Sequence, residues 1–212
     1  MAIKRPYRSP LRSEQAAATR QRIVRAAAGL LLARGYAATR LDQVAAEAGV
    51  ALPTLTGYFP TKAALLDEVL RSVVRGGEED EQAALGDQLT AILEITSPAE
   101  LLAAVAALNR AANERGFELF EILRTAAAAE PNVEQRRREG AEARRRDQAR
   151  VARHLKRRGV LRSDLSPQQA TDLLWLYSSA DIYRLLVRDS GWSPHRYEQW
   201  LGRTLADTLL QP

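Results

Sequence analysis

Residues 41–60, LDQVAAEAGVALPTLTGYFP, decide the fold of this chain. Before Gly49, apolar side chains recur at the helical spacing of positions 41, 44, 45 and 48. Gly49 suits the left-handed conformation that ends many helices, and Leu55 supplies the apolar anchor of a second short helix. Ala45 is small enough for a second helix to cross close by. The pattern predicts a helix-turn-helix, although a helical hairpin in any all-helical protein has similar spacing.

Amphipathic segments lie on both sides of the predicted hairpin. In residues 19–34 the apolar side chains at 23, 26, 27, 30 and 31 share one face, and Gly35 ends the helix. Residues 61–74 carry a second apolar stripe, at 63, 66, 69, 70 and 73. Thr39 is the expected N-cap of the hairpin's first helix. The hairpin therefore has a supporting helix on each side, which favours a DNA-binding domain.

Positive charge is concentrated in the same part of the chain. Residues 1–75 contain 12 Lys and Arg against 5 Asp and Glu, a net charge of +7, so the rest of the chain sums to −2 of the total of +5. A basic surface neutralises DNA phosphates and releases counterions, which supplies affinity for any sequence. Solvated surface charge explains any one arginine, but it explains the asymmetry poorly.

With these features the first third of the chain resembles the TetR family of bacterial transcription regulators. The matching positions are Ile23, Ala26 to Ala28, Gly35, Tyr36, Thr39, Val44, Ala45, Ala48, Gly49, Val50, Thr54, Leu55, Tyr58, Phe59, Lys62, Leu65 and Leu66. The resemblance implies an all-α protein with an N-terminal helix-turn-helix domain of three to four helices and a larger C-terminal helical domain. High Ala, Leu and Arg content and the lack of a convincing strand agree with this.

Three regions are expected along the chain: a flexible basic arm at 1–18, the helix-turn-helix domain at 19–75 and a ligand-binding and dimerisation domain at 76–212. The sequence GGEED at 76–80 marks the second boundary. In the arm, Lys4, Arg5 and Arg8 are predicted to reach along the DNA backbone or into a minor groove. A disordered terminus without fixed contacts fits the same composition.

The second hairpin helix is predicted to read DNA bases, and it departs from the family's usual pattern. Ala51 stands where the family usually has a serine cap, and Pro53 falls in the first turn, where its missing amide is tolerated. Thr56 and Gly57 stand where a tyrosine and a longer side chain are common. We therefore expect a sparsely equipped helix.

Two kinds of DNA contact are expected. Leu52 and Thr54 would face the bases, because their methyl groups suit thymine methyls. Backbone contacts, which position the protein without reading sequence, are expected from Thr39, Arg40, Thr56, Tyr58 and Lys62. Pro53 and Gly57 belong to the same predicted surface.

An arginine-rich helix is predicted at 131–158, from Pro131 in its first turn to Gly159 at its end. Its arginine clusters raise a second nucleic-acid hypothesis. A charged, solvated face with Val133, Val151 and Leu155 turned inward explains them better.

Two further helices are predicted after Ser166 and Ser193, each with a proline in the first turn. The first, up to position 189, is apolar over so much of its girth that it must be covered on more than one side. In the family such late helices form the dimer, so the residues predicted to face a partner are Ile182, Leu186, Trp200, Leu201 and Leu205. A single larger monomeric core is the alternative.

The resemblance also implies a pocket for a small molecule among the middle helices. Its candidate residues are Leu102, Val105, Asn109, Phe117, Phe120, Glu121, Trp175 and Tyr177, all of which ordinary core packing or surface exposure would also explain. The expected function is a repressor released from a palindromic operator by such a ligand. A helical ligand-binding or structural protein without specific DNA binding is the alternative.

Other classes of protein find little support. The chain has no cysteine, its 2 histidines are far apart, and it shows no phosphate-binding glycine loop and no nucleophile elbow. We therefore expect no catalytic residues, metal site or cofactor. No apolar run is long enough to span a bilayer and no secretory signal is present, so a cytoplasmic location is expected.

Overall fold

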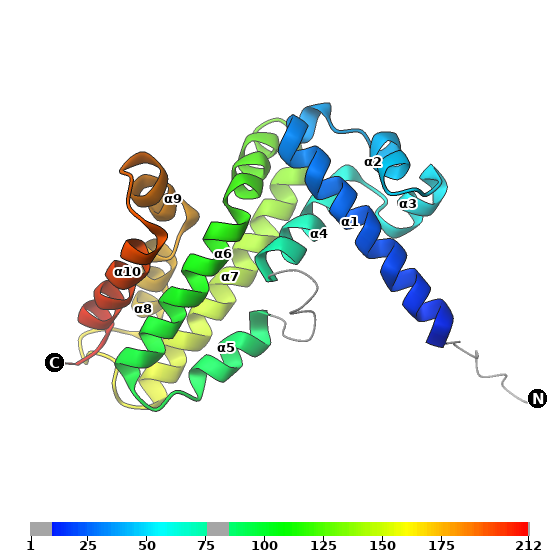
Figure 1. Cartoon of the computed structure of the whole chain (residues 1–212). Coiled ribbons are helices and arrows are strands. Elements are labelled where there is room, and N and C mark those ends of the chain that lie inside the picture. The colour runs from blue at the N-terminus through cyan, green and yellow to red at the C-terminus, as the bar shows by residue number, and fades with distance from the viewer. Residues whose placement is uncertain (1–9, 76–84, 212) are drawn as a thin grey trace, which may run out of the picture. The chain divides into compact units, whose positions relative to one another are not determined.

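The computed structural model describes residues 10–75 and 85–211 (Figure 1). The fold is all-α, as predicted, and within these residues the only β feature is an isolated bridge between Leu161 and Leu210. The chain divides into two compact units, Met1–Val69 and Leu70–Pro212. This division falls inside a helix, whereas the sequence placed the boundary after residue 75.

The first unit is built from α1 (Pro10–Ala38), α2 (Leu41–Glu47), α3 (Leu52–Tyr58) and the first half of α4 (Lys62–Arg75). Its core contains the predicted apolar stripe of α1, since Ile23, Ala27 and Leu31 are buried there. Gly35 leaves helical geometry with φ 72°, which confirms that it ends the regular part of α1.

The predicted arm is wrong over residues 10–18, which belong to α1. The reason is local: a proline is tolerated in the first turn of a helix, and the alanines that follow are strong helix formers. Lys4, Arg5 and Arg8 lie outside the described residues, so their predicted contacts are untested.

The second unit contains the end of α4, α5 (Leu85–Leu93), the long helices α6 (Pro98–Ala127) and α7 (Pro131–Arg157), α8 (Pro167–Tyr177), α9 (Ala180–Tyr183), the π-helix η2 (Arg184–Asp189) and α10 (Pro194–Leu209). The helices α6 and α7 run side by side, with α10 packed on α6 and α8 on α7 (Figure 1). Gly202 of α10 faces Ala103 of α6, where an added Cβ would lie 3.4 Å from the backbone. Arg115 of α6 donates to the carbonyls of Val73 and Val74, the last turn of α4.

Several helix ends follow the local signals in the sequence. Ser97, Ser166 and Ser193 each cap a helix with a side-chain oxygen, and a proline occupies the next position. The predicted end of α7 is confirmed, because Gly159 has φ 69° and the amide of Val160 donates to the carbonyl of Leu155.

The single helix predicted from Ser166 to position 189 is wrong. It breaks at Ser178, and a new helix starts from Ser179, whose side chain caps it. Two side chains of α7 stabilise the chain at this break. Arg144 donates to the carbonyl of Ser178 at 2.9 Å, and Gln148 donates to the Ser178 Oγ at 2.8 Å.

Candidate DNA-binding interface and ligand region

The turn between α2 and α3 has the predicted geometry. Gly49 has φ 64°, its amide donates to Ala46 at 3.1 Å, and the amide of Val50 donates to Ala45 at 3.0 Å. These two bonds form a Schellman motif, which satisfies the last carbonyls of α2. Ala45 is buried at the crossing of the two helices, as a small residue should be.

Thr39 is not the N-cap of α2, so this prediction is wrong. Arg40 occupies the cap position, and its amide donates to the side chain of Gln43 at 3.3 Å. The Thr39 hydroxyl instead donates to the carbonyl of Gly35 at 2.8 Å, and the residue is only 2% exposed. Carbonyls at the kink lack helical amide partners, and they bind this hydroxyl in place of the amides of α2.

The outer face of α3 is open to solvent. Leu52, Pro53, Thr54 and Gly57 are exposed, while Leu55 on the opposite face is fully buried. No side chain caps the helix at Ala51, as predicted from the missing hydroxyl. The Thr56 hydroxyl donates to the carbonyls of Leu52 and Pro53, at 3.2 Å each. In this arrangement only the lone pairs of its oxygen are available to an outside group.

Two of the predicted phosphate-contacting cations already have partners inside the unit. The Lys62 ammonium donates to the carbonyl of Tyr36 at 2.9 Å and lies 4.0 Å from the centre of its ring. Arg40 makes a bidentate pair with Asp42, at 2.8 and 3.0 Å, and this pair lowers the pKa of the Asp42 carboxyl. The Arg40–Asp42 pair is exposed to solvent and anions. The Lys62 contact is half-buried, because Tyr36 is 6% exposed. Tyr58 is half-buried beside Phe59.

An ion pair that the sequence did not predict joins α1 and α4. Arg20 of α1 donates to the carboxylate of Glu68 in α4 at 2.8 Å, and its guanidinium lies 5.3 Å from the ring centre of Phe59. The Glu68 side chain is 5% exposed, and the hydrogen bond to it raises the pKa of Arg20. Glu68 interrupts an otherwise apolar helix face, and this interruption is the feature of the sequence that could have indicated the ion pair.

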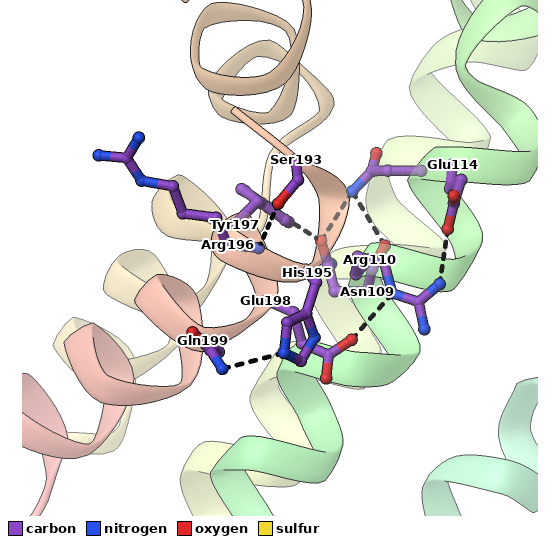
Figure 2. Close-up of polar contacts among 10 residues, drawn as sticks. Asn109, Arg110, Glu114, Ser193, His195, Arg196, Tyr197, Glu198 and Gln199 are labelled. Carbon is purple, nitrogen blue, oxygen red and sulfur yellow. Dashed lines mark hydrogen bonds and ion pairs between the residues drawn. The ribbon is translucent and has the colours of Figure 1, made fainter. Parts of the chain in front are cut away.

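In the second unit, three of the predicted ligand-region residues meet in one aromatic cluster. Tyr197 of α10 donates its hydroxyl to the side-chain oxygen of Asn109 on α6, at 3.1 Å (Figure 2). Ring contacts then run from Phe117 through Tyr183 and Tyr197 to Trp200 and Tyr177, with neighbouring ring centres 5.0 to 6.3 Å apart. Burial raises the pKa of Tyr197, so its hydroxyl stays protonated as a donor.

The other predicted ligand residues lie outside this series of ring contacts. Trp175 lies under the guanidinium of Arg144 at 3.9 Å, and Glu121 pairs with Arg124. Leu102 and Val105 are buried in the same core as Phe117 and Tyr197, and Phe120 is half-buried beside Gly116. The predicted group is therefore part aromatic cluster, part ordinary core.

The predicted dimer residues separate in a similar way. The prediction that Leu201 and Leu205 face a partner is wrong, because both are fully buried in the core of their own chain. Ile182, Leu186 and Trp200 are partly buried at the margin of that core. The large apolar residues that are exposed nearby are Leu176 at 52% and Leu185 at 46%.

Among the described helices, none is long and apolar enough to cross a membrane. The same residues contain no group of three or more His, Asp or Glu placed to hold a metal ion.

Comparison with known proteins agrees with the helix-turn-helix. Residues 23–69 match the family model for bacterial regulatory proteins of the tetR family. No curated protein sequence matches the chain.

The fold of nearly the whole chain is found in solved structures. NalD of Pseudomonas aeruginosa, the secondary repressor of the MexAB-OprM multidrug efflux pump, is 21% identical with a TM-score of 0.71, over 93% of this chain and 98% of that one. A transcriptional regulator of Saccharomonospora viridis in complex with choline is 21% identical with a TM-score of 0.68, over 94% and 100%. The SmeT–triclosan complex is 18% identical with a TM-score of 0.71, over 92% of both chains.

The family match covers the helix-turn-helix and its two supporting helices, and the fold agrees with that of other regulators along the rest of the chain. Residues 23–69 thus form a helix-turn-helix domain of the TetR family of bacterial transcription regulators, and the protein is a DNA-binding regulator.

Proposed function

We propose that this regulator is a homodimeric repressor, that its two α3 helices bind the half-sites of a palindromic operator, and that a small-molecule ligand releases it. The observation that carries the proposal is the exposed outer face of α3, held by the buried Leu55 on its inner side. A second copy supplies the second reading helix that a palindrome requires. Acting on the bacterial chromosome, the protein works in the cytoplasm.

On this surface Leu52 and Thr54 read bases through their methyl groups, while Pro53 and Gly57 allow close approach of the helix backbone. Arg40, Tyr58 and Lys62 contact phosphates, and Thr56 does so by turning its hydroxyl from the carbonyls of Leu52 and Pro53 to a phosphate oxygen. Thr39 has no part in the proposed surface, because its hydroxyl is used at the end of α1. The basic charge of residues 1–75 adds affinity that is independent of sequence.

The ligand would act at the aromatic cluster around Tyr197. Its rings supply apolar contact, and Asn109 and the Tyr197 hydroxyl supply polar groups that orient a ligand. Release requires the ligand to bind the DNA-free conformation more tightly than the DNA-bound one, by an amount equal to the loss of operator affinity. The SmeT and Saccharomonospora structures contain triclosan and choline, which makes both compounds reasonable first probes.

The DNA arm of the proposal is tested by fluorescence anisotropy with the duplex upstream of the protein's own gene and a scrambled duplex, over a salt series. Wild type should prefer the upstream duplex. Thr54→Ala should reduce that preference, while Arg40→Ala should weaken binding to both duplexes and lower the salt slope by about one unit. Arg153→Ala, which removes the same charge from an exposed position on α7, is the matched control.

Equal and weak binding of wild type to every duplex would instead support a helical ligand-binding protein without specific DNA binding. The ligand arm is tested separately, by adding triclosan or choline to the preformed DNA complex and to the free protein. A compound that raises the melting temperature of the free protein and lowers anisotropy of the complex supports release, and Tyr197→Phe should weaken both effects. Stabilisation without release would refute the repressor mechanism for that compound.

A further inference from the structure

Arg144 of α7 is a half-buried cation that forms no ion pair with any described residue. Its guanidinium lies 3.9 Å from the ring centre of Trp175 and donates one hydrogen bond, from Nη1 to the carbonyl of Ser178 at 2.9 Å. Burial lowers the pKa of Arg144, and electrostatic interactions with Tyr197 and Asp181 oppose this effect only in part. The fold therefore keeps a positive charge beside aromatic rings without neutralising it.

The neighbouring arginine provides a contrast. Arg145 also faces the ring of Trp175, with its guanidinium 5.9 Å from the ring centre, but it forms an ion pair with Asp172. Asp181, whose charge acts on Arg144, is an exposed residue and does not pair with it. Of the two cations beside Trp175, Arg144 is thus the one that lacks a carboxylate partner.

The unused donors of Arg144 remain accessible. Nε and Nη2 have no hydrogen-bond partner in the described part of the chain, where the only side-chain nitrogen or oxygen both buried and without a partner is Nε2 of His154. Nε and Nη2 therefore retain some exposed surface. They form one edge of the planar guanidinium, which a carboxylate can bind through two parallel hydrogen bonds.

The aromatic cluster lies close to this cation. Burial raises the pKa of Tyr197, and the charge of Arg144 opposes that rise, so the guanidinium is near enough to act on the phenol. The Tyr197 hydroxyl donates to Asn109 and stays protonated, so it does not neutralise Arg144 (Figure 2). Arg144 therefore has the ring of Trp175 on its face and the cluster around Tyr197 nearby.

We propose that the ligand of this regulator is an anion with an aromatic or apolar body, whose carboxylate binds Nε and Nη2 of Arg144 and whose body packs against the aromatic cluster around Tyr197. The inference rests on the proposed ligand release and specifies the chemical class of the ligand. The carboxylate supplies the negative charge that Arg144 lacks, and the rings supply apolar contact. A cation such as choline would meet repulsion at the same position.

Three probes with one aromatic body and different charge test the ligand class in the full-length protein. They are naphthoate, the neutral naphthamide and the cationic naphthylmethyl trimethylammonium, each titrated by isothermal calorimetry. Wild type should bind naphthoate at least about tenfold more tightly than naphthamide, because charge-assisted hydrogen bonds to a half-buried guanidinium are stronger than neutral ones. The cationic probe should bind most weakly of the three.

Substitutions assign the effect to one side chain. Arg144→Met removes the charge and keeps the length, and should weaken naphthoate about tenfold or more while changing naphthamide by less than about threefold. Arg144→Lys keeps the charge without the planar edge and should retain part of the preference. Arg145→Met is the matched control: it removes the other cation facing Trp175 and should leave naphthoate binding unchanged. Circular dichroism should show the same helix content in all variants.

The outcomes separate this inference from the proposed release mechanism. Equal affinity of wild type for naphthoate and naphthamide, or no binding of naphthoate, would overturn the anionic ligand. Equal losses in Arg144→Met and Arg145→Met would overturn the role of Arg144. Each probe is also added to the preformed DNA complex. Release by the cationic or neutral probe alone would overturn the ligand class and leave the repressor mechanism intact, whereas naphthoate that binds through Arg144 without releasing DNA would support the site and refute release.

Discussion

Two glycines of the helix-turn-helix are predicted to respond to the same substitution with opposite sign. Gly49 has φ 64° and ends α2, whereas Gly57 lies in the last turn of α3 without a positive φ. An added Cβ meets no atom within 4 Å at either position. The two substitutions therefore differ in backbone conformation and not in packing.

The magnitudes follow from that difference. An L-residue in the left-handed conformation costs about 1–2 kcal/mol, so Gly49→Ala should destabilise the turn by that amount. In a helical position alanine is favoured over glycine by about 0.5–1 kcal/mol, so Gly57→Ala should stabilise α3. Neither effect requires DNA, because both concern the free protein.

Native-state hydrogen exchange measures both effects at the amides concerned. The amide of Val50 donates across the turn and that of Phe59 donates to the carbonyl of Leu55, so their protection reports local opening. Gly49→Ala should lower protection of the Val50 amide by about 5- to 30-fold. Gly57→Ala should raise that of Phe59 by about 2- to 5-fold.

Gly140→Ala is the matched control, since this glycine is exposed within α7 and its Cβ would also meet nothing. It should leave the amides of the helix-turn-helix unchanged. Shifts of the same sign for Gly49→Ala and Gly57→Ala would refute the reasoning, because they would show that backbone conformation does not control the response.

Three further predictions concern polar contacts. Glu68→Gln removes the buried charge that pairs with Arg20, and should lower the free energy of unfolding by about 1–2 kcal/mol in urea titrations, less than a fully buried pair would because Arg20 is half exposed. Thr39→Ala should cost about 1–2 kcal/mol in the same assay while Thr39→Ser costs less, and equal losses would show that the hydroxyl contributes nothing. Hydrogen bonds from Arg137 and Arg138 lower the pKa of Glu134 from 4.5 to about 2; the stabilisation from this carboxylate is thus present above pH 4.5 and is lost as pH falls toward 2, and an NMR titration should show its midpoint rising in Arg137→Ala.

The parts of the fold that could be predicted are those in which residues close in sequence determine a helix end. Gly49 and Gly159 each end a helix with a positive φ and the same pair of backbone hydrogen bonds. The serine and proline pairs at Ser166 and Ser193 start helices where expected. In each case the chemistry that sets the boundary lies within a few residues.

The break at Ser178 could not be predicted from local sequence. It depends on Arg144 and Gln148, which lie 34 and 30 residues earlier in the chain and reach Ser178 because α8 packs on α7. A propensity argument applied to the apolar run alone favours one continuous helix. Tertiary hydrogen bonds to the carbonyl and the side-chain oxygen of Ser178 outweigh that local preference.

The candidate site shows the same division. The exposed face of α3 and the buried Leu55 follow from helical spacing, and both were predicted. The partners of Thr39, Arg40 and Lys62 were not predicted. Each side chain can bind several backbone or carboxylate acceptors, and only the folded unit determines which of them lies within reach. Side-chain chemistry states what a residue can bind, and the fold decides which acceptor is nearest.

The contact between Lys62 and Tyr36 has a consequence for the entropy of anion binding. A lysine side chain loses up to about 2 kcal/mol of rotamer freedom when it is fixed in one place. Here the ammonium is fixed on folding by the Tyr36 carbonyl and ring, which use only part of its capacity of three donors. An anion that meets Lys62 therefore finds an ammonium already in position, with hydrogens still free to donate and little further ordering required.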